Sequence, residues 1–239
     1  MNNPTRNIPP SLMRVVVVLV GMQIALTALY ALNVHDVPGT RQFDMDGELN
    51  IPTWWSTSLF LVAGLAALGL ARCNRLLGRA VAPWTLVGIG LFGLSLEEVA
   101  AIHEDVGTAL GGGSGEVSIW PLAYAPFAIL GVWLLIKAVR DLPRPLAVIG
   151  IGGLCCYVLV MAVELSALLG GDAATIALEE NLELLGSGAI FVAVASELVT
   201  RFGVVFVRVD RQEVPAADVA GVLAGLPAER VVAPPVPVR

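Results

Sequence analysis

Long apolar runs separated by short polar segments fill most of the chain between residues 15 and 199. A helix needs about 20 apolar residues to cross a hydrocarbon core roughly 30 Å thick. Six runs approach that length, and they predict helices over roughly 15–33, 54–71, 83–104, 119–138, 146–169 and 176–199. The pattern therefore predicts an all-α fold, a polytopic membrane helix bundle with six transmembrane helices.

The predicted six-helix transmembrane domain covers 15–201 and lies between two segments of different character. Residues 1–14 form a short N-terminal segment, and 202–239 are rich in Ala, Val and Pro without a usable period, which favours a disordered tail. The stretch VVFVRVD, 204–210, fits either the end of the last helix or a short strand. The first apolar run also follows basic residues, as a secretory signal does, but its length and the lack of a clean cleavage site favour a permanent helix.

Composition supports the membrane interpretation. Hydrophobic residues make up 56% of the chain and charged residues 14%, which is far from the usage of soluble domains. Three cysteines cannot build a disulfide framework. Small residues let membrane helices approach closely, so two glycine groups predict tight helix contacts: Gly88, Gly90 and Gly93, and Gly150, Gly152 and Gly153.

The basic residues predict the orientation of the bundle. With six spans, 13 of the 14 Lys and Arg residues fall on one side, and only Arg41 falls on the other. Positive charge collects in cytoplasmic loops, so both termini are predicted to be cytoplasmic. The opposite side is acidic, and such a surface concentrates cations and repels nucleic acid. The expected partners are therefore the lipid bilayer and a metal ion.

Acidic residues and one histidine lie in the outer parts of three predicted helices. Ionisable groups inside a membrane are costly, so each is a candidate functional residue. Helical spacing puts Glu179, Glu180 and Glu183 on one face, and puts Tyr157 and Met161 on the face of Glu164. The candidates by run are Glu97, Glu98, His103 and Glu104 in 83–104, Glu164 in 146–169, and Glu179, Glu180 and Glu183 in 176–199.

So many carboxylates in a low dielectric need either bound protons or a cation. Carboxylates with one imidazole suit iron, manganese or zinc, whereas all-oxygen sites suit calcium or magnesium. We therefore predict a divalent metal site whose ligands are Glu98, His103, Glu164, Glu180 and Glu183. Glu97 and Glu104 would be the catalytic acid or base beside the metal. The alternative is that these acids only reach water at helix ends, where Glu179 and Glu180 would also favour a helix N-terminus.

Three segments resemble recurring signatures of a group of uncharacterised bacterial multi-pass membrane proteins. They are FDMDGELNIPTWWS at 43–56, SLEEVAAIHE at 95–104 and LEENLELLG at 178–186. The resemblance implies a bacterial protein of the cytoplasmic (inner) membrane, and it implies no particular reaction.

Three functions fit the sequence. The first is a metal-dependent membrane enzyme acting on a lipid-like or small substrate at an outward-facing site. The second is a divalent cation or proton-coupled transporter, which ranks lower because the inner halves of the runs offer few polar groups for a path. The third is a noncatalytic partner or sensor subunit. The sequence leaves the choice between enzyme and transporter, and the oligomeric state, open.

Overall fold

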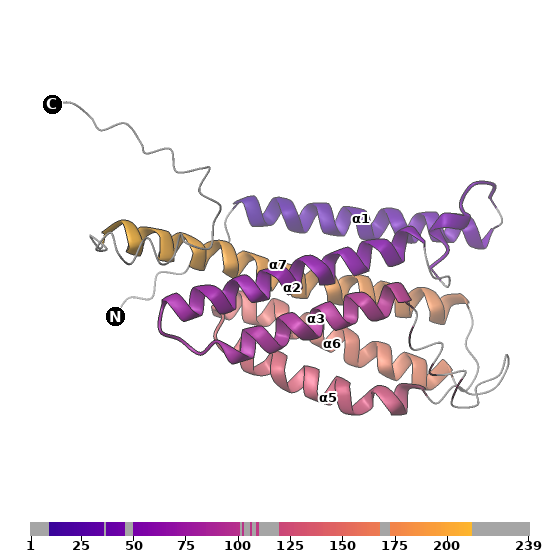
Figure 1. The fold of residues 1–239 in the computed structure, drawn as a ribbon. Helices are drawn as coiled ribbons and strands as arrows, with labels where there is room; N and C mark the ends of the chain where they lie inside the picture. Colours follow the sequence, from indigo (N-terminus) through magenta and orange to yellow (C-terminus); the bar gives the residue numbers. More distant parts are fainter. Residues whose placement is uncertain are drawn as a thin grey trace.

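The computed structural model describes residues 10–35, 37–45, 50–100, 102, 106, 109, 120–167 and 173–211. In these ranges the chain forms long helices and one short 3-10 helix, and no strand occurs (Figure 1). The all-α prediction is confirmed. The helices are α1 (Pro10–Val34), α2 (Ile51–Leu76), α3 (Ala82–Ala100), α5 (Trp120–Val139), α6 (Arg144–Ala167) and α7 (Ala173–Arg211), with η1 (Arg41–Phe43) between α1 and α2.

Four of these helices are long and apolar enough to cross a membrane. Their candidate spans are Met13–Val34, Ile51–Leu76, Arg144–Val163 and Thr175–Gly203. The helix α3 has 19 residues and carries two glutamates near its end, and the apolar part of α5 is shorter, at Ala125–Val139. The described chain thus has the character of a multi-pass membrane protein.

The stretch 204–210 is helical, because α7 continues without a break to Arg211. The helical alternative is therefore confirmed, and the last helix extends beyond residue 201. The remainder of the predicted tail, from 212 onward, lies outside the described residues.

Local capping explains where α2 begins and ends. The side chain of Asn50 accepts a hydrogen bond from the Thr53 backbone N–H at 2.9 Å, and Pro52 stands in the first turn, where its missing N–H costs nothing. At the other end Gly78 adopts a φ of 67°, the left-handed conformation that commonly terminates helices. A short turn follows, so α2 and α3 form an antiparallel pair.

The bundle packs around α2 and α7. The closest helix pairs are α6 with α7, α2 with α3, and α2 with α7, whereas α1 packs mainly on α7. Lipid is as apolar as the side chains, so close packing holds such helices together. The core shared by α2, α3, α5, α6 and α7 includes Phe60, Leu70, Trp84, Leu135 and Val194.

Glycines mark two close contacts between helix backbones. A Cβ on Gly153 of α6 would lie 2.8 Å from the carbonyl oxygen of Gly186 on α7, and one on Gly88 of α3 would lie 3.2 Å from the carbonyl oxygen of Gly64 on α2. The predicted close contact is confirmed at Gly88, Gly150 and Gly153. It is wrong at other predicted positions, because a Cβ there would meet nothing within 4 Å: Gly90, Gly93 and Gly152.

The two ends of the bundle differ in chemistry. One end, on the right in Figure 1, holds the C-terminal parts of α3 and α6 and the start of α7, and we call it the carboxylate end after Glu98 and Glu183. The opposite end holds the α2–α3 and α5–α6 turns, and we call it the basic end after Arg79 and Arg140.

Candidate functional site

Polar groups from four helices meet at the carboxylate end. The Oε1 atom of Glu98 on α3 accepts a hydrogen bond from the Ser56 hydroxyl of α2 at 2.8 Å. The hydroxyl of Tyr157 on α6 donates to the backbone oxygen of Glu183 on α7 at 3.1 Å. The carboxylates of Glu98 and Glu183 both lie within electrostatic range of this hydroxyl. We call Ser56, Glu98, Tyr157 and Glu183 the carboxylate cluster.

Close packing fixes Tyr157 at the centre of this cluster. Its ring stands 5.8 Å, centroid to centroid, from the ring of Phe60 on α2. The ring also lies against Gly186 of α7, where an added Cβ would be only 2.7 Å from the Cε2 atom of Tyr157. Glu98 and Glu183 are half-buried. The glycine contact between α6 and α7 therefore holds the Tyr157 ring close to the backbone of α7.

A neighbouring polar contact ties α1 to α7. The side-chain oxygen of Asn181 accepts from the Gln23 amide at 2.5 Å and from the Thr27 hydroxyl at 2.6 Å. The Asn181 amide in turn donates to the Ala177 backbone oxygen at 2.7 Å. Asn181 and Ser56 were not predicted, because neither side chain is ionisable. The available signal for Asn181 was an amide within an apolar run, between Glu180 and Glu183.

The predicted site residues divide into three groups. The Glu98 carboxylate accepts from Ser56 of α2, and the Glu183 backbone oxygen accepts from Tyr157 of α6. Glu97 and Glu180 are half-buried on the same two helices, and each takes part in further polar or electrostatic interactions. Three predicted residues cannot be placed: His103 and Glu104 lie outside the described residues, and Glu164 belongs to α6 but its side chain is not among those described.

The donor chemistry of the cluster narrows the choice of cation. Among the described residues, no three His, Cys, Asp or Glu side chains lie together as a metal-binding group. The groups at the carboxylate cluster are carboxylates, a serine hydroxyl and a tyrosine hydroxyl, which offer oxygen only. Oxygen donors suit calcium, magnesium and manganese, whereas iron and zinc usually take imidazole or thiolate as well. The described part of the carboxylate cluster therefore offers oxygen donors alone, and the metal site stays a prediction.

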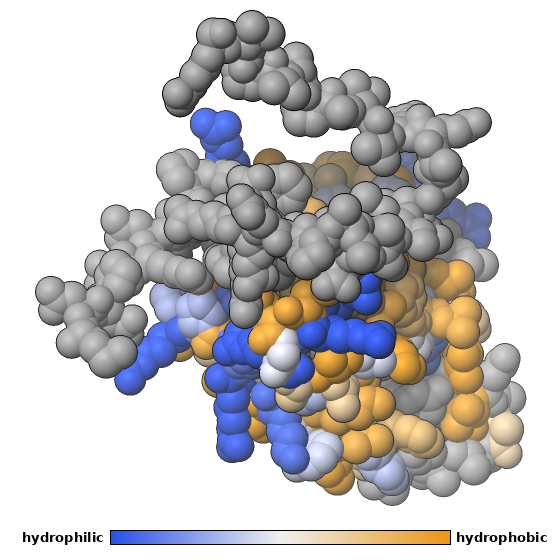
Figure 2. All heavy atoms as spheres, turned by 60° about the vertical axis from the view of Figure 1, so that its left-hand side comes forward, coloured by the Kyte–Doolittle hydropathy of each residue, from blue (hydrophilic) through white to orange (hydrophobic). Residues whose placement is uncertain are grey.

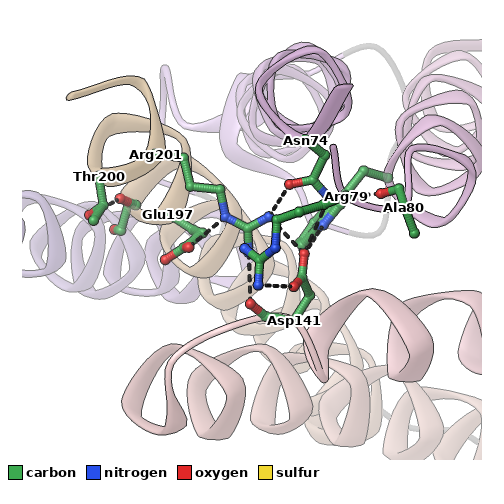
Figure 3. A network of polar contacts seen from close by, with 9 residues as sticks. Asn74, Arg79, Ala80, Asp141, Glu197, Thr200 and Arg201 are labelled. Carbon is green, nitrogen blue, oxygen red and sulfur yellow. Dashed lines mark hydrogen bonds and ion pairs between the residues drawn. The ribbon is translucent and has the colours of Figure 1, made fainter. Parts of the chain in front are cut away.

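A second polar network is buried at the basic end (Figure 3). The guanidinium of Arg201 on α7 is 4% exposed and donates to the Glu197 carboxylate at 2.7 Å. It also donates to the Asp141 carboxylate and to the Asp141 backbone oxygen, each at 2.7 Å, and to the side-chain oxygen of Asn74. One cation thus connects α7 with the end of α2 and the α5–α6 turn.

Further contacts hold the partners of Arg201 in place. The Asn74 amide donates to the backbone oxygen of Ala80 at 2.8 Å, which ties the network to the α2–α3 turn. Asp141 also accepts from the indole of Trp84 at 3.3 Å and pairs with Arg79 at 3.0 Å. We call these residues the Arg201 network. The count of basic residues by side included Arg201 without a partner, although Glu197, four residues before it at the end of the last apolar run, was an available signal.

Asp141 is held as a carboxylate by this network. Burial acts to raise the pKa of its carboxyl, but hydrogen bonds from Arg201, Asn74 and Trp84 and the positive charge of Arg201 outweigh burial, so the net shift is downward. A carboxyl whose pKa is lowered on folding adds stability above its unfolded pKa and loses it as the pH falls through the folded value.

We therefore expect Asp141→Asn to lower the free energy of unfolding by roughly 1–3 kcal/mol at neutral pH, because charge-assisted hydrogen bonds are lost. Below about pH 4, where the carboxyl of the unfolded chain takes up its proton, the parent should lose the same stability and approach the variant. Unfolding curves in detergent between pH 3 and 7 measure this. A difference that stays constant over the whole range would contradict the ionised state of Asp141.

Comparison with known families finds a match over most of the chain. A family model described as "Domain of unknown function (DUF8692)" matches residues 12–198, a range that includes the whole carboxylate cluster and ends just before Arg201. No curated protein and no solved structure matches the chain.

Proposed function

Because the chain belongs to the DUF8692 family, whose description assigns no activity, we propose a function from the site itself: a membrane protein that binds a divalent cation at the carboxylate cluster. One observation carries this proposal. Glu98 accepts a hydrogen bond from Ser56 of α2, and Tyr157, which donates to the backbone oxygen of Glu183, packs its ring against Phe60 one turn further along α2. Half-buried carboxylates from two helices in one neighbourhood are stabilised by a cation or a proton close to them.

In this proposal all six long helices cross the inner membrane of a bacterium, and both termini are cytoplasmic. The distribution of Lys and Arg supports the orientation, since the turns of the basic end carry Arg79, Arg140 and Arg144. The carboxylate cluster then faces outward. A cation would enter from the acidic outer side without crossing the apolar middle of the bundle.

The bound cation would serve a metal-dependent enzyme acting on a lipid-like or small substrate. When bound, a divalent cation supplies Lewis acidity at its open positions. Glu97, next to Glu98 on α3 and half-buried, is the described residue suited to accept or donate a proton beside that position. Glu98 and Glu183 would hold the cation, and Ser56 would orient Glu98 through its hydrogen bond.

Transport is the weaker alternative, for a specific reason at the basic end. Glu197 and Arg201 are ionisable residues of α7 that could line a path, but they are paired with each other and nearly fully buried. The guanidinium of Arg201 already compensates the charge of the Glu197 carboxylate, so a moving cation would meet a neutral pair there. Proteoliposomes loaded with a manganese-sensitive dye separate the alternatives, because a transporter would carry Mn²⁺ inward whereas an outward-facing site would not.

Metal binding itself is tested on the purified full-length protein by equilibrium dialysis against Mn²⁺. We expect Glu98→Gln and Glu183→Gln each to weaken Mn²⁺ binding by at least tenfold, because each removes a negatively charged ligand. Mutating even a group that only orients a metal ligand typically lowers metal affinity about 10–100-fold. Asp44→Asn is the matched control, since it removes one negative charge from the segment between α1 and α2 and leaves the cluster intact. Equal Mn²⁺ binding by the parent and both glutamine variants would contradict the proposal.

A further inference from the structure

A pocket with a basic rim lies at the basic end, on the surface beside the Arg201 network. Its volume is about 290 Å³. Three cations, Arg79, Lys137 and Arg140, line it, together with Asp141 and the apolar side chains of Pro83 and Trp84. The α2–α3 turn, the start of α3 and the end of α5 therefore build this pocket jointly.

The charge of the pocket is positive even though it contains an acid. One oxygen of Asp141 is paired with Arg79 at 3.0 Å, and the other accepts from the buried Arg201 at 2.7 Å. Both oxygens of this carboxylate are thus already engaged by cations. Lys137 and Arg140 are exposed side chains on the same rim. An anion in the pocket would meet these two cations, with the charge of Asp141 already compensated.

The surroundings of the pocket are those of a membrane interface. The Lys137 ammonium lies 4.0 Å from the centre of the Trp133 ring, and Trp133 is half exposed on the outer face of α5. Tryptophan and long basic side chains prefer the membrane interface, where the apolar part of the side chain contacts lipid and its polar end reaches water. Figure 2 shows hydrophilic side chains gathered at this end, with hydrophobic ones directly beside them.

We propose that this pocket binds the phosphate headgroup of an anionic phospholipid. Arginine and lysine pockets at helix ends suit lipid phosphates, and guanidinium matches phosphate with two parallel hydrogen bonds. A pocket of about 290 Å³ has room for a phosphate headgroup. The acyl chains would lie along the exposed apolar side chains of α5, such as Trp133 and Ile136.

The test is native mass spectrometry of the delipidated full-length protein, titrated with phosphatidylglycerol or with phosphatidylcholine of the same acyl chains. The parent should bind phosphatidylglycerol at least tenfold more tightly. The double variant Lys137→Gln/Arg140→Gln should lose roughly tenfold or more of that affinity, because each basic residue near a headgroup contributes measurably. The control Arg72→Gln/Arg75→Gln removes the same charge from exposed positions near the end of α2 that do not line the pocket, and it should change affinity less than twofold.

Three results would overturn the proposal. An equal loss in the Arg72→Gln/Arg75→Gln control would mean that only diffuse charge attracts the lipid. Equal binding of phosphatidylcholine would mean that the headgroup charge is not recognised. Displacement of phosphatidylglycerol by an equal concentration of inorganic phosphate would mean that the pocket binds free phosphate. The substituted side chains are exposed, and unchanged unfolding temperatures would verify that the variants fold.

Discussion

Replacing Arg201 by methionine is expected to lower the free energy of unfolding by about 3–5 kcal/mol, the penalty typical of removing one partner from a buried ion pair. The guanidinium is 4% exposed and donates to Glu197, Asp141 and Asn74. Without it, the nearly buried Glu197 carboxylate would have no opposing charge. Chemical unfolding in detergent micelles measures the loss. Arg72→Met, at an exposed position on α2, should stay within about 0.5 kcal/mol of the parent.

The double variant Arg201→Met/Glu197→Gln separates the buried charge from the lost packing. Glu197→Gln removes the carboxylate that Arg201→Met strands, so the double variant should be more stable than the sum of the two single losses predicts. One Glu197 oxygen, Oε2, has no hydrogen-bond partner among the described residues. A glutamine at this position is neutral, so it needs no opposing charge when Arg201 is removed. Strictly additive losses would mean that the two residues do not interact in the folded protein.

Replacing Gly153 by alanine is expected to cost about 1–3 kcal/mol, the usual penalty for overpacking a core. The added Cβ would lie 2.8 Å from the Gly186 carbonyl oxygen, a backbone atom that cannot rotate away, so α6 and α7 would have to separate. That separation would also move Tyr157 from the Glu183 backbone oxygen, which it now meets at 3.1 Å. We therefore expect weaker Mn²⁺ binding in the same variant.

Gly152→Ala is the matched control for this prediction. It makes the same change one residue earlier on α6, where an added Cβ meets nothing within 4 Å. Its stability and Mn²⁺ affinity should match the parent or improve slightly, because alanine favours a helix over glycine. Unfolding curves and metal titrations of both variants provide the comparison. Equal behaviour of the two variants would exclude a tight α6–α7 contact at Gly153.

The sequence predicted the helices well because a long apolar run can be recognised from the order of residues alone, without knowing how the helices pack. Each of the six apolar runs is helical in the described structure, with ends shifted by local contacts that hydropathy does not contain. The helix α2 begins at Ile51 because Asn50 caps it, three residues before the apolar run appeared to start. The helix α7 continues to Arg211. It includes the segment 204–210, whose β-branched residues were also compatible with a short strand.

The sequence indicated which acids could share a site, but it did not indicate their partners. Spacing indicated that acids of several helices reach similar depths, and this depth stays a prediction. The rotation of each helix about its axis depends on packing, so the sequence could not reveal that Ser56, from a helix without acids, would be the partner of Glu98. For the same reason, adjacent glycines such as Gly152 and Gly153 look alike in sequence and differ in contact.

The Arg201 network shows a further limit of reading charges along the chain. Counting basic residues predicts which side of a membrane a loop occupies, but it treats every charge as solvated. Arg201 is instead buried, and its partners come from the end of α2 and from the α5–α6 turn. Only the folded structure shows that Arg201, whose charge also serves to predict membrane orientation, connects α7 with the end of α2 and the α5–α6 turn.

The central claim, that Glu98 and Glu183 share one cation, is tested most directly by an anomalous difference map of the full-length protein crystallised with Mn²⁺. We predict a manganese peak between the two carboxylates, beside the Tyr157 hydroxyl, and loss of that peak in Glu183→Gln. Carboxylates turned away from each other, with no peak between them at saturating Mn²⁺, would contradict the claim.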